Sequence, residues 1–143
     1  MMIKSVKYAG IAVIMAAVLA GCVRTSTLNW YPPAPDQKSS SGNPVVYNLE
    51  AYNCGLYLFY FIPVWSGRPA YPNRKDYKSF AHFVNEEDTR RMMDIHLKKW
   101  GAEKVEDLSF STDNSWLWGL GILWRRSISA KGVAVKNPII IKK

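Results

Sequence analysis

A long apolar stretch between Val45 and Val64 has the composition of a β-strand. Its sequence, VVYNLEAYNCGLYLFYFIPV, is dominated by β-branched and aromatic residues, which favour strands. Positions 56–62 are all apolar, without the alternation of a half-exposed strand. Such a run is typical of a strand buried on both faces, of a hairpin tip or of a membrane contact. Pro63 predicts the end of this strand, because proline cannot donate a ladder hydrogen bond.

The segment from Asn85 to Trp100 has the pattern of an amphipathic helix. Asn85 is a favourable N-cap, and the three acidic residues that follow it suit the positive end of a helix dipole. Gly101 predicts the end of the helix. At 100° per residue, one face is apolar and the other is charged. The apolar face contains Met92, Met93, His96, Leu97 and Trp100.

Two more strands are predicted after the helix, over residues 104–112 and 125–136. Asp113, Asn114 and Ser115 form a turn signal between them, followed by the apolar stretch WLWGLGILW. The order strand, helix, strand, strand predicts an α+β domain over residues 45–143. We expect a small two-layer sandwich, in which one amphipathic helix covers an antiparallel or mixed sheet.

Residues 22–44 are predicted to form a flexible tether in front of this domain. From Val23 to Pro44 the chain contains four prolines, a serine triplet and few apolar residues. Such a composition buries too little apolar surface to offset the entropy cost of ordering the chain.

Residues 1–21 have the pattern of a secretory signal peptide. Lys4 and Lys7 precede an uncharged apolar stretch over residues 8–20, which is shorter than the roughly 20 residues of a membrane-spanning helix. At the end of this stretch, the residues Leu19-Ala20-Gly21-Cys22 resemble the lipobox of bacterial lipoproteins. In that family the cysteine thiol receives a diacylglyceryl group, the signal is cut just before the cysteine, and the new amino group is often acylated as well.

The resemblance implies that acylated Cys22 attaches the protein to a membrane, since two or more acyl chains hold a protein stably. Val23, in place of an aspartate, resembles the outer-membrane signal of the enterobacterial sorting scheme. The expected location is therefore the periplasmic side of the outer membrane, with the inner membrane as the alternative. An ordinary cleaved signal or an uncleaved anchor helix are the alternatives to a lipobox.

Charge and cysteine content add two expectations. The whole chain carries a charge of +8, and loss of Lys4 and Lys7 with the signal would leave +6. This charge suits anionic lipid headgroups or cell-wall polymer, but equally a solvated basic surface. Cys54, in an apolar and aromatic context, is expected to be a buried thiol; a disulfide-linked dimer or a reactive thiol is the alternative.

No catalytic or phosphate-binding motif occurs in the sequence, so we expect neither enzymatic activity nor a cofactor. His96 lies on the apolar face of the predicted helix and is interpreted as a core residue. Cys54, His82 and His96 have suitable chemistry for zinc, but their spacing does not support a metal site.

Two aromatic stretches, Leu56–Trp65 and Trp116–Trp124, are the unusual feature of the chain. Together they contain four tryptophans: Trp65, Trp116, Trp118 and Trp124. Arginines flank both stretches, and Trp with adjacent cations is typical of a membrane interface. The stretches either form one apolar end that docks on a membrane, a partner or a second copy, or they are central strands buried under the helix.

Segments around IPVWSG and SISAKGVAVK resemble those of a loose group of small, uncharacterised bacterial envelope lipoproteins. A weaker likeness is to the Rcs-type envelope stress sensor, a tethered lipoprotein with a small α/β domain and disulfides. We expect a non-catalytic structural, accessory or interaction role in the envelope. The alternatives are a ligand-binding or stress-sensing module and, more distantly, a periplasmic hydrolase. The expected partners are the membrane and an envelope protein or cell-wall polymer, with no nucleic acid; an oligomer remains open.

Overall fold

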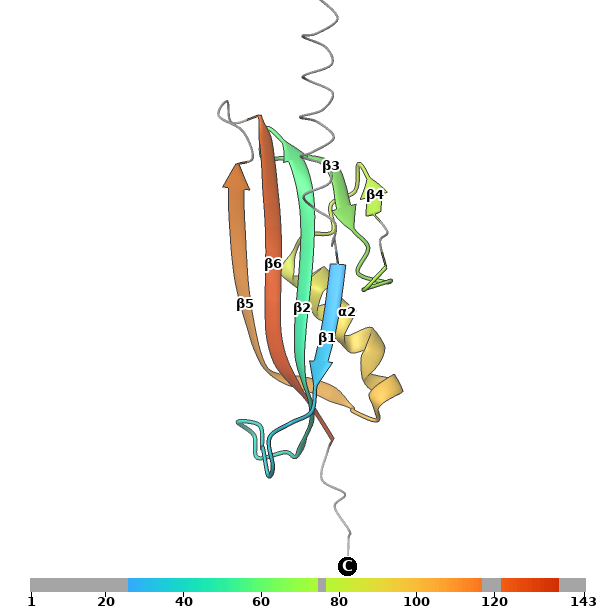
Figure 1. Ribbon diagram of the computed structural model, residues 1–143, viewed down its shortest axis with the longest axis vertical. Helices are drawn as coiled ribbons and strands as arrows, with labels where there is room; N and C mark the ends of the chain where they lie inside the picture. The colour runs from blue at the N-terminus through green and yellow to red at the C-terminus, as the bar shows by residue number, and fades with distance from the viewer. Residues whose placement is uncertain (1–25, 75–76, 117–121, 137–143) are drawn as a thin grey trace, which may run out of the picture.

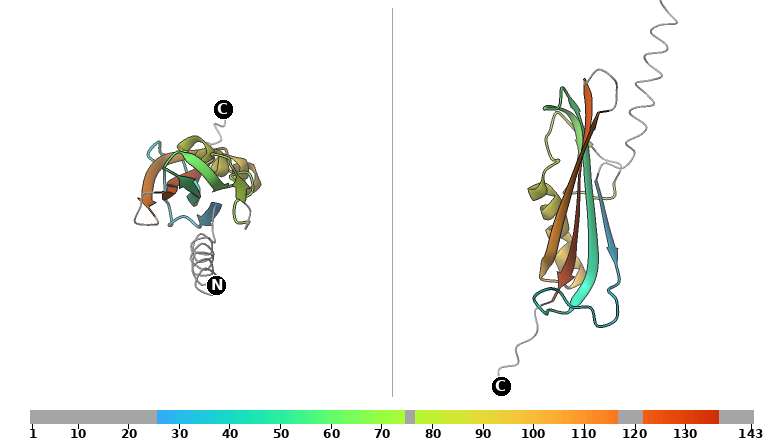
Figure 2. Two further views of the ribbon diagram at one scale, coloured as in Figure 1. Left: turned by 90° about the horizontal axis from the view of Figure 1, so that it is seen from above. Right: turned by 90° about the vertical axis from the view of Figure 1, so that its left-hand side faces the viewer.

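The computed structural model describes residues 26–74, 77–116 and 122–136 (Figure 1). It is an antiparallel sheet with one α-helix lying on one of its faces (Figure 2). This confirms the predicted α+β class with a helix covering a sheet. The elements are β1 (Ser26–Tyr31), β2 (Val45–Leu58), β3 (Ile62–Gly67), β4 (Tyr77–Ser79), α2 (Glu86–Leu97), the 3₁₀ helix η1 (Lys98–Trp100), β5 (Lys104–Trp116) and β6 (Leu123–Val135).

Strand β2 is the centre of the sheet, whose order is β4-β3-β2-β6-β5. One edge of β2 pairs with β6 over its whole length, from Val45 opposite Val135 to Leu58 opposite Leu123. The other edge is shared by two strands. β1 lies opposite residues 48–53, and β3 lies opposite residues 55–58. Both are antiparallel to β2, so β1 runs away from the end of the sheet at which β2 finishes.

The helix begins where the sequence predicts, and the last turn of the predicted helix, up to Trp100, is the 3₁₀ helix η1. The side chain of Asn85 accepts a hydrogen bond of 2.7 Å from the backbone N–H of Asp88, and Gly101 has a φ of 69° after the last turn. Met92, Met93 and Leu97 are buried against the sheet. Their partners in the core include Leu28, Leu49, Ala51, Ala130 and Ala134.

The predicted tether is wrong for residues 26–44, because its first part forms strand β1. Leu28 is only 1% exposed and belongs to the core under the helix. The ring of Trp30, on the same side of β1, packs 5.2 Å from the ring of Trp100. The turn that follows is joined to the sheet by a hydrogen bond of 2.9 Å, which the side-chain amide of Gln37 donates to the side-chain carbonyl of Asn48 on β2. The alternation of buried and exposed side chains along β1 therefore allows a strand in spite of the prolines that follow it. Residues 22–25 of the predicted tether lie outside the described part of the chain.

Two predicted strand ends are also wrong. Pro63 lies within β3, opposite Tyr57, next to a shift in register between Leu56 and Tyr57. Proline is tolerated at such an irregularity of the ladder. Asp113, Asn114 and Ser115 form no turn, because β5 continues through them to Trp116. Their partners on β6 are Ser127, Arg126 and Arg125, so cross-strand pairing overrides the local turn signal.

Candidate functional site

Two hairpins finish side by side at one end of the sheet, the upper end in Figure 1. The first joins β2 to β3 through residues 59–61, and the second joins β5 to β6. The backbone N–H of Phe59 donates a 2.7 Å hydrogen bond to the carbonyl of Ile122, which connects the two hairpins. The ring of Trp124 lies 5.3 Å from that of Tyr60 and 6.3 Å from that of Trp116. The two hairpins therefore present one surface.

This surface is apolar and exposed, and we call it the aromatic end. Six of the twelve exposed large apolar side chains among the described residues lie on it, which is a strong concentration at one end of the sheet. They are Phe59, Tyr60, Phe61, Ile62, Trp116 and Ile122. Phe61 is 72% exposed and Trp116 is 60% exposed. An exposed apolar patch of this kind indicates an interaction surface.

The backbone of the first hairpin is unusual for its sequence. Phe59 and Tyr60 have φ values of 50° and 75°, in the left-handed region that bulky residues rarely adopt. Asparagine and glycine adopt this region at much lower cost. The hairpin therefore keeps two aromatic side chains at positions where they strain the fold, and such strain points to a role outside folding.

Two arginines follow directly below the aromatic end on β6. Arg125 lies opposite Leu56 and Arg126 lies opposite Gly55, so the two side chains leave opposite faces of the sheet. The guanidinium of Arg125 lies 3.6 Å from the carboxylate of Asp113. An ion pair therefore lies behind the apolar surface on one face of the sheet, and Arg126 adds a positive charge on the other face.

The four tryptophans predicted as docking residues divide into three groups. Trp116 is exposed on the aromatic end, and Trp124 is half-buried there. Trp118 and Cys22 lie outside the described residues. The prediction of Trp65 as a docking residue is wrong. Trp65 lies on β3 opposite Leu56 and is only 8% exposed, because this strand pairs with both β2 and β4. Phe59, Tyr60 and Phe61 lie within the predicted aromatic stretch Leu56–Trp65, but the sequence singled out only its tryptophan; the unbroken apolar run over 56–62 was the signal for a hairpin tip.

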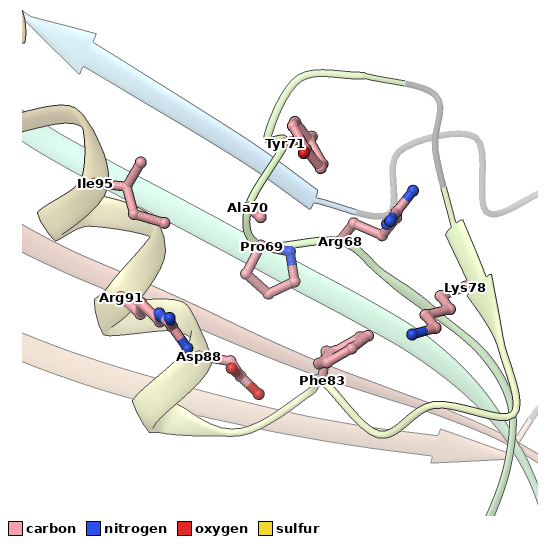
Figure 3. Close-up of a pocket in the computed structure, with 9 residues that line it drawn as sticks. All are labelled: Arg68, Pro69, Ala70, Tyr71, Lys78, Phe83, Asp88, Arg91 and Ile95. Carbon is pink, nitrogen blue, oxygen red and sulfur yellow. The ribbon is translucent and has the colours of Figure 1, made fainter.

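A second feature is a pocket of about 240 Å³ between α2 and the segments on either side of β4 (Figure 3). Arg68, Lys78 and Arg91 line it, against the single carboxylate of Asp88. Asp88 itself accepts a hydrogen bond of 2.8 Å from the side chain of Asn85. The ring of Tyr71 also lines the pocket, with the guanidinium of Arg68 5.4 Å from its centre. The pocket therefore combines an excess of positive charge with an aromatic wall.

Two tyrosines of β2 are shielded from water: Tyr57 is buried and Tyr52 is half-buried. The hydroxyl of Tyr57 and Nδ1 of His82 are 2.8 Å apart, and burial raises the pKa of Tyr57 to about 12. Burial also raises the pKa of Tyr52 to about 12, with a further contribution from the neighbouring Cys54. Cys54 is 2% exposed, in agreement with the predicted buried thiol. These phenols stay protonated at neutral pH, which suits structural hydrogen bonds.

Residues 26–74, 77–116 and 122–136 contain no group of three or more His, Cys, Asp or Glu side chains arranged to hold a metal ion. No helix within these ranges has both the length and the apolar character needed to cross a membrane. Comparisons of the chain with protein-family models, with curated proteins and with solved structures give no match.

Proposed function

We propose that this protein is a bacterial envelope lipoprotein with a non-catalytic structural, accessory or interaction role. In this proposal residues 1–21 are a signal peptide, Cys22 carries the acyl chains, and the α+β domain faces the periplasm at the outer membrane. The lipobox supports the anchor. The observation that carries the interaction role is the aromatic end, where Phe61 and Trp116 are exposed on adjacent hairpins.

The short distance between the anchor and the domain supports a structural role. Strand β1 begins at Ser26, four residues after Cys22, and four residues span at most ~14 Å. A domain held so closely stays next to the bilayer. It is better suited to a fixed contact at the membrane surface than to reaching a distant target.

The lipid anchor is tested by growing cells with an alkyne-bearing fatty acid and isolating the protein. We expect the label on the wild-type protein in the outer-membrane fraction, and mass spectrometry should place it on the peptide that begins with Cys22. Cys22→Ala should abolish labelling. Cys54→Ala is the matched control, because Cys54 is buried within β2 and should leave labelling unchanged. An unlabelled wild-type protein, or a label retained by Cys22→Ala, would contradict the proposal.

The basic pocket favours ligand binding as a second candidate function. Lys78 and Arg91, which line the pocket, would attract an anionic group. N-acetylmuramic acid, a carboxylated sugar of the cell wall, is a suitable probe for NMR titration. We expect shifts of the backbone signals of Arg68, Lys78 and Arg91, and their loss in Arg91→Gln. Arg90→Gln is the control, because Arg90 pairs with Asp94 outside the pocket.

A further inference from the structure

We propose that the aromatic end is a second membrane contact, which enters the interface of the same bilayer leaflet that holds Cys22. The domain would then stand on the membrane with its strands close to the membrane normal. This inference rests on the proposed lipidation of Cys22. It names the partner of the aromatic end as a lipid surface.

The direction of β1 places the anchor near the correct end of the sheet. Ser26 lies opposite Asn53, and β1 runs from there away from the aromatic end. The distance along β2 from Asn53 to Leu58, at the aromatic end, is about 17 Å. From Asn53 to Val45, at the opposite end, it is about 27 Å. Because Cys22 lies within ~14 Å of Ser26, a fully extended link brings it to about 3 Å short of the level of Leu58, whereas it stays at least about 13 Å short of the level of Val45. The acyl chains therefore lie much nearer to the aromatic end than to the opposite end.

The side chains on the aromatic end suit a bilayer interface better than water. Tyr60 and Trp116 provide the amphipathic rings that concentrate at the headgroup level, and Phe59 and Phe61 add apolar rings beside them. Arg125 and Arg126 follow on β6 just behind them, where a cation can contact phosphate groups. The arrangement of apolar rings in front and cations behind matches the depth profile of a lipid surface.

The opposite end of the sheet has a different character. Its turn, residues 36–43, reads DQKSSSGN and contains no aromatic or aliphatic side chain. Trp30 and Tyr31 lie nearer to that end and are about half exposed, and the ring of Trp30 packs against that of Trp100. Among the described residues, the exposed apolar side chains are therefore concentrated at the aromatic end, as expected of a domain that stands upright on a membrane.

Strain in the first hairpin gives an independent argument. Phe59 and Tyr60 occupy the left-handed region of φ, although glycine or asparagine would form this turn at lower cost. The tip residue Phe61 is 72% exposed and makes little use of its ring within the domain. A contact with lipid would explain why aromatic side chains occupy this turn.

The experiment uses the full lipidated protein in vesicles of phosphatidylethanolamine and phosphatidylglycerol. Phe61→Cys is labelled with an environment-sensitive fluorophore, and Ser41→Cys, in the polar turn at the opposite end, is the matched control. Both positions are exposed in the domain, so both variants should fold. Background labelling should be low, because Cys54 is buried and Cys22 would carry lipid. Trp116→Cys, on the second hairpin, is a second reporter.

Lipids with brominated acyl chains then report contact with the bilayer. We expect a blue-shifted emission at positions 61 and 116 and strong quenching by the brominated lipids, with neither effect at position 41. Equal quenching at 41 and 61 would show a domain lying flat and would overturn the upright arrangement. A blue shift at position 61 without lipid quenching would assign the surface to a second copy of the chain and overturn the inference.

The experiment distinguishes failure of the membrane contact from failure of the proposed lipid anchor. The mass of each labelled protein shows whether it carries acyl chains. If the acyl chains are present and position 61 stays in water, the membrane contact is wrong while the lipoprotein proposal stands. If the acyl chains are absent, the anchor is wrong, and the inference that depends on it falls as well.

Discussion

The hydroxyl of Ser26 on β1 donates a hydrogen bond of 2.9 Å to the side-chain carbonyl of Asn53, directly opposite on β2. The amide nitrogen of Asn53 donates in turn to the backbone carbonyl of Phe83, in the segment that leads into α2. Ser26 and Asn53 are both buried. One amide therefore joins the first strand, the central strand and the segment before the helix.

Replacement of Asn53 should destabilise the domain strongly. Asn53→Ala removes both hydrogen bonds and leaves the Phe83 carbonyl without this partner inside the protein, so we expect a loss of about 2–4 kcal/mol in the free energy of unfolding. Urea denaturation measures this loss. Asn114→Ala is the control, because Asn114 is exposed on β5, and its effect should stay within about 0.5 kcal/mol. Equal effects of the two substitutions would show that the bonds of Asn53 contribute little.

A comparison of Trp65 with Phe61 tests which aromatic residues belong to the core. Trp65→Ala should lower the free energy of unfolding by about 3–5 kcal/mol, because this side chain is 8% exposed. Phe61→Ala should change it by less than about 0.5 kcal/mol, because Phe61 is 72% exposed. Thermal unfolding followed by circular dichroism can rank the two variants. The reverse order would refute the assignment of Trp65 to the core and of Phe61 to the surface.

The helix was predictable because its signals are local. Asn85, Gly101 and the apolar positions between them lie within 17 residues, and their roles depend on the helix alone. Strand β1 was missed because its stability is not local. The six residues of β1 stay ordered through their pairing with β2 and through the packing of Leu28 and Trp30 on the helix side.

The candidate site was likewise only partly predictable, because the exposure of the aromatic stretches depends on contacts between distant strands. Their composition predicted either an exposed end or buried strands, and the structure contains both outcomes. Trp65 and Trp116 differ in exposure because Trp65 lies between two neighbouring strands, whereas Trp116 is the last residue of the outer strand β5. No pattern in the sequence predicted the pocket, because Arg68, Lys78 and Arg91 come together only through the path of the chain around β4.

A redesign of the first hairpin should separate stability from membrane contact. The double variant Phe59→Asn, Tyr60→Gly places residues that tolerate positive φ at both strained positions. Relief of roughly 1–2 kcal/mol per residue outweighs the loss of the Tyr60–Trp124 ring contact, worth about 0.5–1.5 kcal/mol. We therefore expect a net gain of about 1 kcal/mol in urea denaturation, together with weaker quenching of the label at position 61 by brominated lipids. A destabilised variant would show that the two aromatic side chains serve the fold.

Alkaline pH should destabilise the domain through its buried tyrosines. Burial raises the pKa of Tyr57 to about 12 in the folded protein, whereas an unfolded chain has a tyrosine pKa of about 10. Between pH 10 and 12 the unfolded state therefore binds fewer protons than the folded state, so stability falls as the pH rises. Below pH 10 both states keep this proton, and the contribution does not vary. Tyr52, also raised to about 12 by burial, adds a fall of the same sign.

Urea denaturation at pH 8, 9, 10 and 11 tests this expectation on Tyr57→Phe, which keeps the ring and removes the ionisable hydroxyl. At pH 8 the variant should be less stable by about 1 kcal/mol, because it loses the hydrogen bond to His82. Between pH 9 and 11 its stability should fall less steeply than that of the wild type, with the remaining fall due in part to Tyr52. Tyr77→Phe, at an exposed position on β4, should follow the wild-type curve. If Tyr57→Phe ran parallel to the wild type over this range, the Tyr57 hydroxyl would not be the group that links folding to alkaline pH.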